Sequence, residues 1–267
     1  MTMINCVLPI STLFPDMPSG FVSKFRTAEH KRFDDRDVPV FQDRIFHSDY
    51  AVVNDSFLAV LEKQEAFRFL NAYRVRRFSF DIGPCFRQVE VVDNRYVGIG
   101  QRLNMAEIYE LCEERLNYLR QRLHGACELA VENMNYYSTG AYEDVCEPEF
   151  YNEICHRYDL KLVFDVAHAQ VTACNRRISL RDYIRKYDFS LVREIHLSKI
   201  GIVDGEAVDA HDKPDDEEFE ILLDLIGNIS RGIDVVIEYY KDIAGLMKAY
   251  ERLEQVLHEN VKNNTPS

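Results

Sequence analysis

The sequence predicts an α/β fold, specifically a (β/α)8 TIM-barrel-like domain of parallel strands that alternate with helices. Short apolar and β-branched runs alternate with longer stretches of helical periodicity, which implies parallel strands joined by right-handed crossovers. Neither GxGxxG nor GxxxxGK[ST] follows the first apolar run, so the nucleotide-binding type of open sheet loses its main support. The length of 267 residues fits one closed barrel.

Seven strands are predicted from the apolar and β-branched runs. In chain order these runs are 5–8, 38–46, 77–82, 127–131, 161–164, 193–197 and 233–237. A complete barrel requires an eighth strand, which we expect to be weak, irregular or missing. The segment 10–40, with FPDMPSG and the charged EHKRFDDRD, is predicted to be loop.

Six helices are predicted between or after these strands, because apolar residues recur there with helical spacing. They cover 56–73, 105–123, 147–158, 180–187, 215–229 and 242–260. No linker, internal repeat or low-complexity segment interrupts the pattern. We therefore expect a single barrel domain over 1–260, followed by a frayed polar tail at 261–267.

The charge balance and the cysteine pattern narrow the class of protein. Lys and Arg number 32 against 45 Asp and Glu, a formal charge of −13, which argues against a nucleic-acid-binding surface. No apolar run approaches a membrane span, and the N-terminus lacks the features of a signal peptide. The seven cysteines include no CxxC pair, so reduced thiols in a cytoplasmic protein are expected.

Four polar residues stand at the ends of predicted strands. Glu132 and Asp165 each follow an apolar run directly, in LAVEN and KLVFD, and His196 and Glu238 occupy the ends of REIHL and DVVIE. The carboxyl ends of barrel strands meet at one rim, where the active sites of these folds are built. We therefore predict that the four side chains converge.

Three further candidates bring histidine and carboxylate groups to the same rim. His168 follows Asp165 by three residues, and Asp209 and His211 are spaced i, i+2, which in an extended segment turns both side chains to one side. Mixed imidazole and carboxylate donors suit iron, manganese or zinc, whereas magnesium and calcium prefer oxygen alone. Crowded carboxylates without a metal would cost several kcal/mol per buried ion. The pattern predicts a metal centre of one to three ions.

Each of these residues also has a purely structural interpretation. Asp165 could cap the turn that follows it, and Glu238 could pair with Arg193 or Lys199. Tyrosines flank the candidate ligands in two pairs, 136–137 and 239–240, of which half are expected in the core. We predict that Tyr136 and Tyr239 are the members that line and gate a substrate cleft.

The motifs in residues 127–240 together resemble the multinuclear non-haem iron-dependent oxidative enzymes, the family that includes MbnB and TglH. That family has a Glu-Asn after a middle strand, then an Asp with a nearby His or Asn, an Ile-His-Leu strand, a D-x-H and a late Glu. The matching positions are Glu132 with Asn133, Asp165 with His168, His196 within Ile-His-Leu, Asp209 with His211, and Glu238.

The resemblance implies a barrel related to xylose isomerase that holds two or three iron ions and activates O2. Its implied substrate is a cysteine-containing, ribosomally made peptide, with a separate partner protein that binds the leader. The family places one histidine after the second strand and another after the third. His47 is matched to the first of these, and the second position holds Asp81, a carboxylate that would change the charge and potential of its ion.

Two other functions remain open. One is a sugar isomerase or endonuclease of the wider barrel group, in which Glu132, Asp165, His196 and Glu238 hold manganese, zinc or magnesium. The other is a degenerate barrel that binds a peptide without catalysis, which the departure at Asp81 keeps open. Metal content separates these possibilities.

Overall fold

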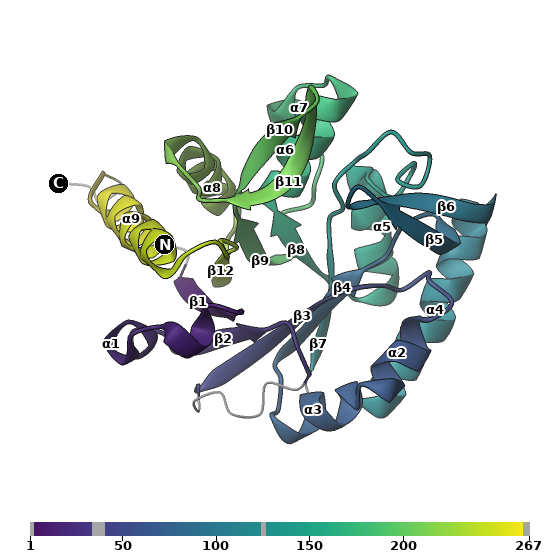
Figure 1. The fold of residues 1–267 in the computed structure, drawn as a ribbon, viewed down its shortest axis with the longest axis horizontal. Helices are drawn as coiled ribbons and strands as arrows, with labels where there is room; N and C mark the ends of the chain where they lie inside the picture. The colour runs from purple at the N-terminus through teal and green to yellow at the C-terminus, as the bar shows by residue number, and fades with distance from the viewer. Residues whose placement is uncertain (1–2, 34–40, 124–126, 264–267) are drawn as a thin grey trace.

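Eight parallel strands close into a barrel, as the computed structural model describes for residues 3–33, 41–123 and 127–263 (Figure 1). The order around the barrel is β1-β12-β9-β8-β7-β4-β3-β2, and every neighbouring pair is parallel. The strands are β1 Ile4–Ile10, β2 Thr27–His30, β3 Asp43–Ala51, β4 Arg77–Asp81, β7 Glu128–Glu132, β8 Lys161–Asp165, β9 Val192–Leu197 and β12 Ile233–Ile237.

Helices surround the strands, with α8 and α9 on the left of Figure 1 and α2, α3 and α4 on the right. The longer ones are α4 Met105–Arg122, α5 Pro148–Tyr158, α6 Val166–Arg176, α8 Asp216–Asn228 and α9 Ile243–Asn263. The short ones are η1 Phe14–Asp16, α1 Ser19–Val22, α2 Phe57–Lys63, α3 Ala66–Ala72 and α7 Leu180–Ile184. No helix within the described ranges is long and apolar enough to span a bilayer.

Two antiparallel hairpins, which were not predicted, follow the C-terminal ends of barrel strands. One pairs β5 Phe86–Val92 with β6 Arg95–Arg102, and the other pairs β10 Lys199–Val203 with β11 Glu206–Asp212. The second hairpin carries the predicted Asp209-x-His211 motif on its β11 strand. Both hairpins therefore stand at the rim where the candidate residues gather.

The eighth strand exists and lies in the segment that was predicted to be loop. β2 covers Thr27–His30, and all four of its residues are buried. Three of the four are polar, so the strand has neither an apolar run nor an alternation that hydropathy could detect. The predicted strand 38–46 is shifted, since β3 runs from Asp43 to Ala51, and residues 38–40 lie outside the described residues.

The six predicted helices are present, one of them divided in two, whereas α6 and the short helices η1 and α1 were not predicted. The single helix expected over 56–73 is two helices, because Glu65 takes a left-handed backbone conformation with φ 54° between α2 and α3. Helix α6, which was not predicted, begins at Val166 immediately after β8, with Asp165 as its N-cap. The helix α9 extends to Asn263, into the segment expected to fray, and residues 264–267 lie outside the described part of the chain.

The barrel interior is layered along its axis. Strand alternation turns every second side chain inward. Midway along the axis lies a small apolar cluster of Val7, Ile45 and Val236, separate from the main core between strands and helices. Two residues before Ile45 and Val236 stand the acidic Asp43 and Asp234, and two residues after them stand the candidate ligands His47 and Glu238. The apolar cluster fills only part of this level, since His196 on β9 pairs with Val236 on β12.

The charge network at the N-terminal end of the barrel centres on buried Arg77. Its guanidinium donates to Glu128 Oε2 at 2.8 Å, to Glu194 Oε2 at 3.1 Å and to Asp234 Oδ2 at 2.7 Å. Glu194 in turn places Oε1 3.0 Å from Nε2 of His196. The network therefore connects the base of the barrel to a candidate ligand.

Candidate metal centre

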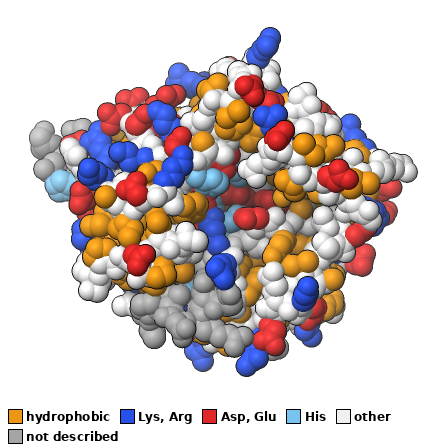
Figure 2. Space-filling model, in the orientation of Figure 1, with side chains coloured by type: hydrophobic (Ala, Val, Ile, Leu, Met, Phe, Trp, Pro, Cys, Tyr) orange, Lys and Arg blue, Asp and Glu red, His pale blue; other side chains and the backbone are white. Residues whose placement is uncertain are grey.

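Seven acidic or histidine side chains from separate strands converge on the C-terminal rim of the barrel. One comes from each barrel strand other than β1, either within the strand or directly after it. These strands are β2, β3, β4, β7, β8, β9 and β12. In chain order they are Glu29, His47, Asp81, Glu132, Asp165, His196 and Glu238. Figure 2 shows acidic and histidine side chains gathered in the hollow at the middle of this face, with basic groups beside them.

His196 lies at the centre of this set and is fully buried. Its Nδ1 is 2.6 Å from Glu132 Oε1 and 3.6 Å from Glu238 Oε2. Its Nε2 is 3.1 Å from Glu29 Oε1 and 3.0 Å from Glu194 Oε1. The strand register supports this arrangement, since Asp165 pairs directly with His196 across β8 and β9.

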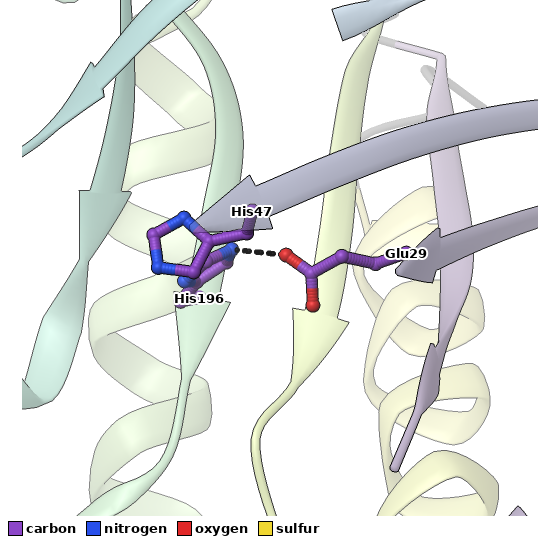
Figure 3. Close-up of side chains that lie close together, drawn as sticks. All are labelled: Glu29, His47 and His196. Carbon is purple, nitrogen blue, oxygen red and sulfur yellow. Dashed lines mark ion pairs between the residues drawn. The ribbon is translucent and has the colours of Figure 1, made fainter. Parts of the chain in front are cut away.

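Two groups of side chains are compact enough to hold a metal ion. In each, one ligand atom per residue lies within 4.8 Å of all the others. The first group is Glu132, Asp165, His196 and Glu238, the four residues predicted to converge. The second group is Glu29, His47 and His196, which point toward one another from three strands (Figure 3). The two groups share His196, so they form one centre.

Among the residues that the structure describes, several buried polar atoms of this centre form no well-oriented hydrogen bond, although oppositely charged groups lie close to some of them. They are both carboxylate oxygens of Glu29, Oε1 of Glu132, Oδ2 of Asp165 and Nδ1 of His196. Buried polar groups are normally satisfied, and exceptions need an explanation. Anionic oxygens and an imidazole nitrogen turned toward each other fit a cation between them. The donor chemistry therefore fits a metal centre.

The β10–β11 hairpin and helix α6 bring three more of the predicted residues to the rim: Asp209 and His211 on β11, and His168 on α6. His168 Nε2 is 3.5 Å from Asp209 Oδ2, and His211 Nε2 is 3.4 Å from the same oxygen. His211 Nε2 also lies 3.5 Å from Glu238 Oε2, and His168 Nδ1 lies 3.8 Å from Glu132 Oε2. The i, i+2 motif thus turns both side chains toward the centre, as expected.

The Glu-Asn motif fixes the position of neighbouring donors. Asn133 accepts from the Asp165 amide at 2.7 Å and donates to the Asp165 carbonyl at 3.0 Å. Its own carbonyl lies 2.7 Å from Nδ1 of His168, which leaves Nε2 of that ring facing the centre. Asp165 also accepts from the His168 amide at 2.6 Å, so its predicted capping role and its place in the centre coexist.

The excess of buried carboxylates alters the protonation of the centre. Burial, together with the Glu132 and Glu238 carboxylates, raises the pKa of Asp165 to about 7. Burial and the Glu132 charge likewise raise the pKa of Asp81 to about 7. Burial alone would lower the pKa of His47, but the charge of Glu132 raises it to about 9. In the metal-free protein, protons held by Asp165, Asp81 and His47 therefore offset part of the negative charge of the centre.

This protonation predicts how the metal-free protein responds to pH. A folded-state pKa above the unfolded value gives stability that is present at low pH and lost as the pH rises. The pKa of Asp165 rises from 3.8 to about 7, so its contribution to stability is lost as the pH rises through that range. The pKa of His47 rises from 6.5 to about 9, so its contribution is lost over the higher range. We expect the melting temperature in chelator to fall between about pH 5 and 9. Added Zn²⁺ should restore most stability at the alkaline end, whereas a midpoint that rises steadily with pH would contradict this account.

Two of the predicted site residues are not at the centre. Tyr136 donates its hydroxyl to Glu143 at 2.8 Å, and Tyr239 donates to Asp242 at 2.6 Å. The cavity of about 340 Å³ beside the centre is instead lined by Tyr137 and Tyr240. Tyr136 and Tyr239 are therefore not among the residues that line this cavity, and their role as a gate stays a prediction.

The predicted strand positions of His47 and Asp81 also need correction. Because β2 was missed, His47 was placed on the second strand and Asp81 on the third, but they lie on the third and fourth strands. The second strand contributes Glu29, which was not predicted. His47 joins the second compact group, whereas Asp81 lines the cavity without belonging to either group.

The fold and the site define a barrel with a buried histidine and carboxylate centre suited to metal. The chain belongs to the family of RiPP precursor modification enzymes MbnB/TglH/ChrH, whose profile matches residues 104–259, more than half of its length. RiPPs are ribosomally synthesised and post-translationally modified peptides. A UPF0276 protein of Psychromonas ingrahamii is 32% identical over 71 residues, a match that spans 27% of this chain and only 25% of that protein.

Several solved structures with the same barrel are named as sugar epimerases or as an isomerase domain protein. A D-tagatose 3-epimerase-like protein has a TM-score of 0.63 at 13% identity, covering 98% of this chain and 100% of its own. A xylose isomerase domain protein from Planctomyces limnophilus has a TM-score of 0.58 at 11% identity, with 95% and 96% covered. At such identities the likeness establishes the xylose-isomerase-like (β/α)8 fold alone.

Proposed function

We propose that the protein is an iron-dependent oxidative enzyme that uses O2 to modify a cysteine-containing peptide. The observation that carries the proposal is the convergence of buried carboxylate and imidazole groups at the barrel rim, several of them without a well-oriented hydrogen bond, in a chain of this peptide-modifying family. The sugar-epimerase neighbours do not weigh against it, because they share only the fold.

The donor set supports iron over magnesium or calcium. Four imidazoles, from His47, His168, His196 and His211, face the carboxylates at the rim. A centre with four imidazole nitrogen donors suits iron, with manganese or zinc as alternatives. Magnesium and calcium sites, by contrast, are built from oxygen donors. Together with the carboxylates, the four imidazoles exceed the donors that one ion needs. We therefore propose two or three ions.

The roles of individual residues follow from their contacts. Glu194 lies 3.0 Å from Nε2 of His196, so Nδ1, which faces Glu132, is the ring nitrogen that would be available to a metal. Such a carboxylate behind a ligating histidine fixes its tautomer and orientation. Asp209 places Oδ2 3.5 Å from Nε2 of His168 and 3.4 Å from Nε2 of His211, so it would hold metal together with both histidines.

The cavity beside the centre would receive the substrate side chain. Its lining includes Met134, Tyr137 and Tyr240 next to the candidate ligands, so a cysteine thiol can be held against them away from bulk water. Bound iron would supply the electron-transfer chemistry that couples O2 reduction to oxidation of the thiol. We further propose that a separate partner protein binds the leader of the peptide, which leaves this chain to hold the segment that is modified.

Iron content is the first test of the proposal. Protein expressed with added iron and purified without oxygen is expected to contain at least one iron per chain and to show a near-ultraviolet or visible band. Addition of a single-cysteine peptide should shift this band and start O2 uptake, whereas the same peptide with serine in place of cysteine should do neither. Iron far below one per chain would contradict the proposal, and manganese-dependent ketose conversion would favour the isomerase alternative.

A further inference from the structure

One basic side chain, Lys31, reaches into the candidate metal centre. It follows β2 directly, two residues after Glu29, and its side chain is 24% exposed. Its ammonium forms an ion pair with Oε1 of Glu238 and lies 3.9 Å from Oε2 of Glu29. Both carboxylates are buried, at 4% and 0% side-chain exposure, so this is no surface ion pair.

The two carboxylates divide their oxygens between Lys31 and the imidazoles. Glu29 turns Oε2 toward Lys31 and Oε1 toward His196 Nε2, at 3.1 Å. Glu238 turns Oε1 toward Lys31 and Oε2 toward His196 and His211, at 3.6 and 3.5 Å. A carboxylate that bridges two cations divides its oxygens in the same manner. Lys31 therefore lies where a second cation beside the histidines would lie.

The surroundings of the ammonium are built to hold positive charge. The Tyr240 ring lies 5.7 Å from Nζ, within the range of a cation–π contact. The Tyr240 hydroxyl donates to Glu238 Oε1 at 2.9 Å and holds that oxygen in place. Two carboxylates and one aromatic ring therefore lie around the Lys31 ammonium, and imidazoles lie beside the other oxygens of the same carboxylates.

We propose that Lys31 is a built-in cation that takes the place of one metal ion between Glu29 and Glu238. The centre would then bind one ion fewer than its carboxylates could otherwise hold, because an ion beside the ammonium meets like charge. The inference rests on the proposed metal centre, and it adds a limit on the number of ions that the centre accepts. It also explains why a lysine is placed among donors suited to metal.

Metal counting in charge-neutral variants tests this inference. Co²⁺, which air does not oxidise readily, is dialysed to saturation into metal-free protein, and bound cobalt per chain is measured with its visible absorption. Lys31→Met keeps the length of the side chain without its charge and is expected to bind one more ion than the wild type. Exposed Lys24 provides the matched control, and Lys24→Met should bind the wild-type number.

A double variant guards against indirect effects of the substitution. Lys31→Met with Glu29→Gln removes one of the two carboxylates that would hold the extra ion, so the count should return to the wild-type value. Circular dichroism confirms that each variant is folded, and Lys31→Gln replaces Lys31→Met if the latter is not. An equal or smaller cobalt count in the folded single variant would overturn the role of Lys31. A wild type that binds no metal would instead overturn the proposed metal centre.

Discussion

Replacement of His211 by alanine is expected to abolish turnover and weaken metal binding while the barrel stays folded. The His211 side chain is 38% exposed on the β10–β11 hairpin, so its loss removes little buried packing. Its Nε2 lies 3.4 Å from Asp209 and 3.5 Å from Glu238, so its loss removes a donor from between two carboxylates. Loss of a group behind a ligand costs about 10–100-fold in affinity, and loss of a ligand should cost more than about 100-fold.

The backbone of His211 supports the same interpretation. Its φ of 43° lies in the left-handed region, which a non-glycine residue occupies only where its surroundings enforce it. The matched control is His258, exposed on α9 and outside the cavity lining, where alanine should change neither iron content nor O2 uptake. If the His211→Ala protein keeps full iron and full O2 consumption with a cysteine-containing peptide, His211 is not a ligand and the assigned centre is wrong.

Much of the fold follows from the sequence because parallel strands buried on both faces form apolar runs. Strands such as β8 and β12 have this pattern, and their ends were placed within a residue. The strand β2 could not be found in this way, because its inward side chains, Thr27 and Glu29, serve the polar interior instead of an apolar one. The strand is indicated only by the need of a closed barrel for an eighth strand.

The candidate site was predicted wherever a donor stands near the end of a recognisable strand or directly after it. Glu132, Asp165, His196 and Glu238 were found in this way, and the structure brings them together. Glu29 lies within β2 and Lys31 directly follows it, so both were missed with that strand. Glu194 was missed for a different reason: it contacts the centre only through His196, and sequence spacing carries no information on such contacts.

Arg77 offers a test of whether the base of the barrel supports the centre at its rim. Replacement of Arg77 by methionine is expected to destabilise the metal-free protein by about 3–5 kcal/mol, the cost of removing one partner from a buried ion network. The substitution leaves Glu194 and Asp234 buried without their main counter-charge. Because Glu194 contacts Nε2 of His196, metal affinity should also fall by about 10–100-fold.

The adjacent residue, Arg76, provides a control with the same chemistry in a different environment. Its guanidinium also contacts Asp234, at 2.9 Å, but its side chain is 38% exposed, against 3% for Arg77. An exposed pair contributes little, so Arg76→Met should change the free energy of unfolding by less than about 1 kcal/mol and leave metal affinity unchanged. Urea unfolding in chelator gives the stability of each variant, and metal titration of the folded proteins gives the affinity. If Arg77→Met behaves like Arg76→Met in both measurements, the base of the barrel does not support the centre. If Arg77→Met loses stability alone, the contact between Glu194 and His196 does not position the histidine for metal.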